Sequence, residues 1–217
     1  MQIPRACRKR ITKFFESITS EELVRYVGDW TTIMPRSDHD ELNRWRFAYC
    51  TVHTPWLRSC EQYNAIRNTY ENTNKESLVK ILKNTSGGMW DIKATGISTL
   101  HDYWQDTPEI FEPQTNWQRF RNNLVSKLKK LGFAKTSFAI EMIHPHEAQC
   151  ICIDRHMFKA FGWENVDRAC SPEQYHYYEN WWIDLSNSFG IAPVVSRNLF
   201  WDQIQQQPSS MYWAKYL

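Results

Sequence analysis

Apolar residues recur along the chain mostly at the three- and four-residue spacing that places them on one face of a helix. Alternating apolar and polar positions, which are typical of strands, are scarce, and residues 150–153 are the one short extended candidate. Turn signals such as Glu112-Pro113 and His144-Pro145 separate the periodic stretches. The expected helices, one or two of them in the first range, cover residues 14–27, 41–70 with a break at Thr54-Pro55, 75–82 after a capping Asn74, 89–104, 115–130, 135–143, 154–162 and 172–189. The pattern predicts an all-α fold.

The size and composition of the chain restrict the fold class further. With 217 residues, 42% of them hydrophobic and 15% aromatic, the chain can bury a sizeable core, and disorder over most of its length is excluded. Only 7 glycines argue against a glycine-rich nucleotide-binding architecture and against an all-β sandwich. No repeat, low-complexity tract or linker interrupts the pattern. We therefore expect a single helical domain over residues 1–217, with a basic N-terminal arm over 1–13 and C-terminal helices over 165–217 that pack back on it.

Three features of the sequence bear on its location. The longest apolar runs fall far short of the roughly 18 residues that a membrane span needs. The N-terminus is charged where a secretion signal would be apolar. Six cysteines are too few for a disulfide scaffold and suit reduced thiols. We expect a cytoplasmic monomer that has no contact with a membrane.

Basic residues gather in two places although the net charge is only +2. Residues 1–13 and residues 121–135 each contain several Lys or Arg and no acid. Two such clusters on a near-neutral chain fit a face that contacts phosphates. Solvated helix faces are the equally weighted alternative.

The spacing of Lys135 and Asp154 carries the most chemical information. A helix that begins near Lys135 and ends near Ile143 is about 12 Å long, Pro145 breaks it, and an extended stretch can cover the same distance back. Asp154 then lies near the end of the domain where Lys135 started, at a position suited to a helix N-cap. Alone, each residue is most often a solvated lysine or a simple cap. Together they predict an amine and a carboxylate at one cleft, a pair that can perform covalent chemistry.

The same segment resembles a known family. The run Leu131-Gly132-Phe133-Ala134-Lys135, followed 19 residues after its lysine by Ile153-Asp154-Arg155-His156, is similar to the motifs of the helix-hairpin-helix DNA glycosylase superfamily, nearest its 8-oxoguanine DNA glycosylase and endonuclease III-like bifunctional members. Residues 88–94 resemble the family's Gly-Leu-Tyr-x-x-Lys-Ala turn, and residues 47–56 resemble the early helix whose end supplies residues inserted into DNA. The resemblance covers about residues 40–165 and implies an all-α glycosylase fold, with the helix-hairpin-helix over 124–143.

The resemblance implies a DNA glycosylase with associated abasic-site lyase activity. Lys135 would attack C1′ of a nucleotide flipped out of double-stranded DNA, and Asp154 would stabilise the positive charge that develops on the sugar. The resulting Schiff base would allow β-elimination at the 3′ phosphate, and no metal or redox cofactor is required. 8-Oxoguanine is the expected base, because Ile-Asp-Arg-His resembles the archaeal 8-oxoguanine branch. The residues expected to contact DNA are Gly132, Ala134, Lys129, Lys130, His156, Trp56 and His53.

The sequence departs from the family pattern at the hairpin and after Asp154. The hairpin has one glycine where the family has two, and Gly132 is displaced by one position, so we expect a remodelled approach to the DNA phosphate. The iron–sulfur cysteine pattern of endonuclease III is absent after Asp154, where only Cys170 lies, and we expect no cluster. The His and Cys pairs within residues 144–152 lack the usual Cys-x2-Cys spacing of zinc sites, and we expect no metal there.

Other interpretations of the same residues stay open. The chain would be a monofunctional glycosylase if Lys135 only positions DNA, or a base-hypermodification enzyme, as some phage proteins with this scaffold are thought to be. A non-catalytic helix-hairpin-helix DNA-binding module is the alternative outside enzymes, and Asp154 counts against it because a pure binder has no use for an acid that faces phosphates. Trp56 and His53 are each either a wedge in the base stack or a core residue, and His156 either contacts a phosphate or packs in the core. Each alternative fits an intracellular protein, nucleoid-associated or encoded by a phage.

Overall fold

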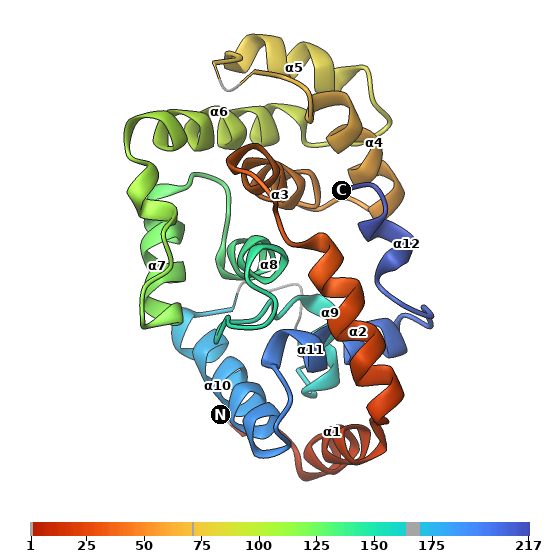
Figure 1. Ribbon diagram of the computed structural model, residues 1–217. Helices are drawn as coiled ribbons and strands as arrows, with labels where there is room; N and C mark the ends of the chain where they lie inside the picture. Colours follow the sequence, from red (N-terminus) through yellow and green to blue (C-terminus); the bar gives the residue numbers. More distant parts are fainter. Residues whose placement is uncertain (1, 71, 164–169) are drawn as a thin grey trace.

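All regular structure in the computed structural model is helical (Figure 1). The structure describes residues 2–70, 72–163 and 170–217, and these contain no strand. The helices are α1 (Arg5–Ser17), α2 (Ser20–Ile33), α3 (Asp38–Cys50), α4 (Trp56–Ile66), α5 (Lys75–Lys83), α6 (Trp90–Asp106), the 3-10 helix η1 (Pro108–Phe111), α7 (Trp117–Lys127), α8 (Phe133–Ile143), α9 (Arg155–Ala160), α10 (Pro172–Ser188), α11 (Pro193–Ile204) and α12 (Met211–Ala214). The predicted all-α class is confirmed. No helix in the described ranges has both the length and the apolar character needed to span a membrane.

Polar side chains define where several helices begin. Asn74 accepts a hydrogen bond from the N–H of Ser77, so the predicted cap of α5 is present. Thr19 and Ser171 each form a reciprocal capping box, with Glu22 and Gln174 respectively. Such caps satisfy N–H groups that have no partner inside the helix, and each is worth about 1 kcal/mol. The starts of these helices are therefore encoded locally.

Helix α8 forms the centre of the molecule. In Figure 1 it is seen nearly end-on, with α3, α7 and α2 around it. Every residue of α8 from Thr136 to Ile143 is buried, and its main contacts are with α3 and α7. A helix that is buried on all sides is held by the core rather than by one face. The first turn of α8, which carries Lys135, is therefore positioned by the packing of the whole domain.

Both ends of the described chain pack on the core. Ile11, Phe14 and Phe15 of α1 are buried, so the basic residues of the predicted arm lie on a helix that is anchored by its apolar face. At the other end, the indole ring of Trp213 in α12 stacks on Trp56 of α4 with 5.3 Å between ring centroids. Residues 165–169, at the start of the predicted C-terminal segment, lie outside the described residues.

Candidate active site

The hairpin between α7 and α8 consists of residues 128–132 and is tied to the core through its backbone. The hydroxyl of Tyr49 donates a hydrogen bond to the carbonyl of Lys129 at 3.0 Å. Gly96 in α6 makes this possible, because a Cβ at that position would lie 2.2 Å from Cε1 of the Tyr49 ring. Within the hairpin the left-handed conformation falls on Lys130, with φ of +70°, and not on the glycine.

Gly132 is the N-cap of α8 and adopts an ordinary extended conformation, with φ of −99°. A Cβ at this position would meet no atom within 4 Å. The protein itself therefore does not require glycine there. No side chain in the described part of the chain caps this end of α8, so its first N–H groups are directed outward from an electropositive helix end. Lys129 and Lys130 are exposed beside it.

Asp154 is the N-cap of α9, and both of its carboxylate oxygens accept hydrogen bonds. Oδ1 accepts from the N–H groups of His156 and Met157, each at 3.0 Å. Oδ2 accepts from the indole Nε1 of Trp201 in α11 at 2.7 Å. Three donors from two elements thus fix the position of the carboxylate.

The segment that leads to Asp154 is held by buried side chains. Residues 150–153, predicted to be extended, form no helix and pair with no strand among the described residues. Their N–H groups donate instead to side chains: that of Ile151 to Glu179, that of Cys152 to Glu141 and that of Ile153 to the hydroxyl of Tyr175. These bonds take the place of the ladder that a neighbouring strand would supply.

Two arginines neutralise the buried acids of this segment. Arg121 pairs with Glu179, and Arg197 pairs with Glu141 at 3.5 Å while its Nε donates to the carbonyl of Cys152 at 2.8 Å. Burial raises the pKa of Glu141, and the charge of Arg197 opposes that rise. Since a buried charge without its partner is costly, both members of each pair are needed to hold the segment.

Lys135 and Asp154 line one small pocket. The Nζ of Lys135 lies 5.8 Å from the ring centroid of Trp56 and 5.6 Å from that of Phe138, within the range of a cation–π contact. The enclosed space amounts to about 10 Å³, roughly the room of one water molecule. The remaining lining residues are Cys152, Arg197, Asn198, Trp201 and Trp213. The structure therefore places an amine and a carboxylate together among aromatic rings.

A second lysine lies within electrostatic reach of this pocket. Lys93 of α6 is fully buried, and its Nζ donates to the carbonyl of Cys50 at 2.7 Å, to Oγ1 of Thr54 at 2.6 Å and to Oε1 of Gln62. Burial lowers the pKa of Lys93 to about 8, and repulsion from Lys135 adds to the effect. Lys93 ties the turn after α3 to α4 and α6.

The other residues predicted to contact DNA lie in three places. Gly132 and Ala134 are at the start of α8, beside the exposed Lys129 and Lys130 of the hairpin. His53 is exposed on the turn between α3 and α4, with φ of +48°, and does not line the pocket. His156 is exposed next to Asp154, where Nε2 of Gln205 lies 2.8 Å from its Nδ1.

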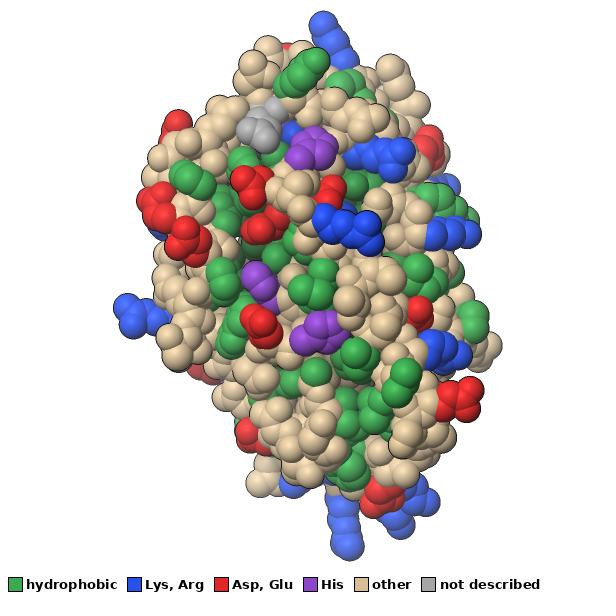
Figure 2. Space-filling model, viewed as in Figure 1, with side chains coloured by type: hydrophobic (Ala, Val, Ile, Leu, Met, Phe, Trp, Pro, Cys, Tyr) green, Lys and Arg blue, Asp and Glu red, His purple; other side chains and the backbone are tan. Residues whose placement is uncertain are grey.

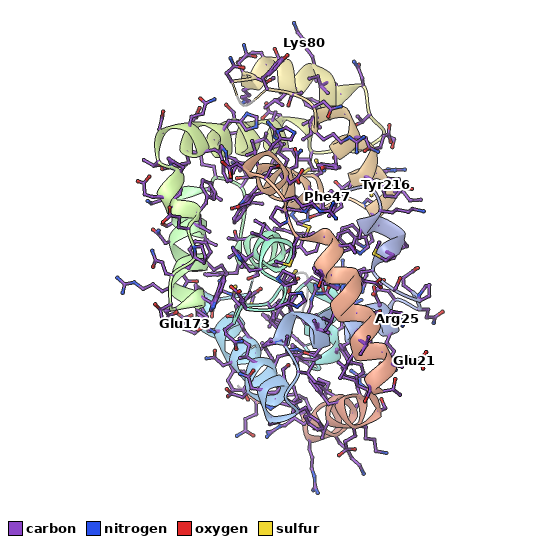
Figure 3. All side chains as sticks on the ribbon, in the orientation of Figure 1. Glu21, Arg25, Phe47, Lys80, Glu173 and Tyr216 are labelled. Atoms are coloured by element: carbon purple, nitrogen blue, oxygen red, sulfur yellow. The ribbon has the colours of Figure 1, made fainter. Side chains whose placement is uncertain are left out.

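Trp56 belongs to the core and also lines the candidate pocket. Its ring stacks on those of Phe47 and Trp213, so it is part of the aromatic core where α3, α4 and α12 meet (Phe47 is labelled in Figure 3). It is also only half-buried and lines the pocket of Lys135.

Sequence reasoning missed the pocket residues of the last two helices, Arg197, Trp201 and Trp213. One signal was present for the first of them: Arg197 and Asn198 lie between the apolar residues Val194, Val195, Leu199 and Phe200, and polar residues in such a stretch are expected to have buried partners. Glu141, in the apolar α8, gives the same signal. No comparable signal distinguishes the pocket tryptophans from the other Trp residues of the chain.

The His and Cys pairs within residues 144–152 do not converge. Cys150 and Cys152 are buried, whereas His146 is exposed and lies 2.9 Å from Oγ1 of Thr31. The ring of His144 packs against Trp117. Among the described residues, no group of three or more His, Cys, Asp or Glu side chains is placed to hold a metal ion.

Solved structures match this chain over nearly its whole length, although no protein-family model and no curated protein matches the sequence. The 8-oxoguanine DNA glycosylase of Thermotoga maritima has a TM-score of 0.77 at 14% identity, over 93% of this chain and 99% of that one. Methanocaldococcus jannaschii 8-oxoguanine glycosylase/lyase, in complex with 15mer DNA containing 8-oxoguanine, has a TM-score of 0.75 at 17% identity, over 92% and 97%. A further structure of the 8-oxoguanine DNA glycosylase from that archaeon has a TM-score of 0.74 at 16% identity, over 92% and 94%. The likeness confirms the predicted helix-hairpin-helix glycosylase fold.

Proposed function

We propose that the chain is a DNA glycosylase with an associated abasic-site lyase activity. The observation that carries the proposal is that Lys135 and Asp154, separated by 19 residues in sequence, line one pocket. The likeness of the fold to 8-oxoguanine DNA glycosylases supports it, because that likeness covers 93% and 92% of this chain in two solved structures.

In the proposed reaction, the neutral amine of Lys135 attacks C1′ of the flipped nucleotide. The N-glycosidic bond breaks, its electron pair leaves on the base, and the base takes up a proton. The carboxylate of Asp154, fixed by three N–H donors, stabilises the positive charge that develops on the sugar. Loss of a proton from the lysine nitrogen and opening of the sugar ring give a protonated Schiff base. Loss of a C2′ proton then breaks the C3′–O bond to the 3′ phosphate.

The hairpin is the proposed contact for the DNA backbone. The uncapped N-terminus of α8 offers N–H groups to a phosphate, and the exposed Lys129 and Lys130 add positive charge at the same end. Because a Cβ at Gly132 would meet only open space, the absence of a side chain there leaves the backbone accessible to a ligand.

We propose 8-oxoguanine as the base that is removed, as the names of the structural neighbours suggest. The pocket beside Lys135 is lined by the rings of Trp56, Phe138 and Trp213, which are suited to stacking on a purine. Since its space is about that of one water molecule, a base enters only if ring side chains shift. Duplexes with 8-oxoguanine or unmodified guanine opposite each normal base, assayed for base release, would test this specificity.

The central experiment is trapping of the Schiff base. The protein is incubated with a duplex that contains an abasic site, in the presence of borohydride, which reduces the C=N bond and leaves a covalent protein–DNA adduct. We expect an adduct with the unaltered protein and with Lys80→Ala, a control at an exposed position of α5 (labelled in Figure 3). We expect none with Lys135→Ala. Asp154→Asn is expected to slow base release by orders of magnitude.

The outcomes separate the alternatives. An adduct that persists in Lys135→Ala would remove Lys135 as the nucleophile. Base release without any adduct would indicate a monofunctional glycosylase in which Lys135 positions DNA. Binding of duplex DNA without turnover of any lesion would overturn the proposed activity and favour a binding module.

A further inference from the structure

A groove of about 660 Å³ lies between α1, α9 and α11, outside the pocket of Lys135. Phe14 of α1 and Phe200 of α11, both buried in the core, form part of its apolar floor. Its rim is made of polar and charged side chains. The reaction described above uses none of these rim charges.

The ionisable side chains along this groove, within the described residues, are all basic. Arg10 and Lys13 line it from α1, and His156 and Lys159 line it from α9. In each pair the two residues are three positions apart, so they share one face of their helix at about 4.5 Å along its axis. Figure 2 shows Lys and Arg side chains projecting from the lower end of the molecule, where Figure 1 places α1.

Two of the four rim residues have fixed positions. The guanidinium of Arg10 donates to the carbonyl of Ala160, at the end of α9, at 2.8 Å. The ring of His156 is oriented by Gln205, whose Nε2 lies 2.8 Å from its Nδ1. These bonds connect α1 to α9 and α9 to the end of α11, so the rim is preorganised rather than a set of independent surface charges.

The groove begins where the candidate active site ends. The N–H of His156 donates to Oδ1 of Asp154, and the ring of His156 packs edge-on against Trp201 at 6.1 Å. Trp201 in turn donates to Oδ2 of Asp154 and lines the pocket of Lys135. A DNA strand that presents a nucleotide to the pocket therefore has the groove beside it.

We propose that this groove binds the phosphates of the DNA strand that flanks the target nucleotide on one side. The inference rests on the proposed function and adds a second backbone contact, separate from the hairpin. Lys13 and Lys159 supply point charges for successive phosphates, while the apolar floor packs against the deoxyribose. This contact reads no bases, and it increases affinity only for DNA that is long enough to reach it.

The test measures binding as a function of DNA length. Duplexes carry a tetrahydrofuran abasic analogue, which the enzyme cannot cleave, with one arm kept short and the other extended stepwise, in one series for each side. We expect the affinity of the unaltered protein, measured by fluorescence anisotropy, to rise with arm length on one side. In the double variant Lys13→Gln with Lys159→Gln this gain is lost, about a tenfold weakening at moderate salt. The slope of log Kd against log salt concentration falls by about 2.

A matched control variant distinguishes an effect of the groove from an effect of lost positive charge in general. Arg5 and Lys9 are exposed on α1 but do not line the groove. The double variant Arg5→Gln with Lys9→Gln removes the same net charge from the same helix. We expect it to keep the gain with arm length.

Equal losses in the two double variants, or an affinity that does not depend on arm length, would overturn the inference. So would unchanged DNA binding by the groove variant, which would indicate another anionic partner. In all these cases a trapped adduct on abasic DNA would leave the proposed function intact. If the unaltered protein forms no adduct and releases no base, the proposed function fails, whatever the groove binds.

Discussion

Two lysine amines of this molecule lie within electrostatic reach of one another in opposite surroundings. The Nζ of Lys93 is fully buried and donates to three acceptors from α3, α4 and the turn between them. The Nζ of Lys135 lies over the rings of Trp56 and Phe138 at cation–π distance. Within the described residues it makes no hydrogen bond and no ion pair. The first amine is used by the fold, and the second is available for a ligand.

The difference shows that a lowered pKa does not by itself identify a nucleophile. Burial lowers the pKa of Lys93 to about 8, which would suit an attacking amine. Its three acceptors, however, take up its hydrogens, and its side chain is fully buried. A nucleophile needs both a neutral form and freedom from structural hydrogen bonds, and among the described residues Lys135 makes no such bond.

The largest expected effect is on the trapped adduct. We expect Lys135→Ala to reduce the rate of adduct formation by about 10³-fold or more, whereas Lys93→Met retains it within about tenfold per folded molecule. Single-turnover trapping, with the folded fraction measured by circular dichroism, provides the comparison. An adduct in Lys135→Ala together with its loss in folded Lys93→Met would assign the attack to Lys93.

A smaller effect is expected on the free energy of unfolding, and here the change at Lys93 should cost more than the change at Lys135. Lys93→Met leaves the buried carbonyl of Cys50 and the side chain of Gln62 without their donor, so the free energy of unfolding should fall by about 1–3 kcal/mol. Lys135→Met removes no hydrogen bond and should change it by less than about 0.5 kcal/mol. Urea denaturation measures both. Equal losses would mean that the two lysines support the fold alike.

The pH dependence of stability sharpens the contrast. The pKa of Lys93 is about 8 in the folded protein and 10.5 ordinarily, so the unfolded chain binds more protons between these values. The free energy of unfolding should therefore rise with pH from about 8 to 10, by at most about 1.4 kcal/mol per pH unit. In Lys93→Met this rise should be absent. Urea denaturation at each pH measures both profiles. If the free energy of unfolding of the unaltered protein and of Lys93→Met changed with pH in the same way, the rise would not come from Lys93.

The smallest expected effect on stability is at the hairpin. Gly132→Ala should change the free energy of unfolding by less than about 0.5 kcal/mol, because its conformation is extended and its Cβ meets open space. Binding to an abasic duplex should nevertheless weaken, since the Cβ hinders the approach of a phosphate. Gly96→Ala is the contrasting control, because its Cβ would collide with Tyr49 and destabilise the fold. Unchanged binding by Gly132→Ala would exclude the close phosphate approach.

Local signals in the sequence were sufficient for most of the helices up to residue 189. The break at Thr54-Pro55 separates α3 from α4 as expected, and Asn74 caps α5. These features depend on a few neighbouring residues, so periodicity and capping rules predict them. Helix α11 was not singled out, because it is buried on all sides and its apolar residues mark no single face.

Of the candidate site, the sequence could predict only the part that α8 and the extended segment after it place together. The spacing of Lys135 and Asp154 places them at one end of the domain because helix length and strand rise are fixed. Trp201 and Trp213 reach the same pocket from later helices, and their positions depend on how α11 and α12 pack against α4 and α9. Such contacts depend on the tertiary arrangement of the chain, which no local pattern specifies.

The segment 151–153 has the appearance of a loop, yet its amide hydrogens are bonded to Glu179, Glu141 and the hydroxyl of Tyr175 inside the core. Each amide can exchange with deuterium from the solvent only when α8 or α10 moves away from the segment. We therefore expect these three amides to exchange as slowly as those in the middle of α8, and amides of the hairpin to exchange far sooner. We thus expect the carboxylate of Asp154 to be attached to one of the last parts of the protein to open.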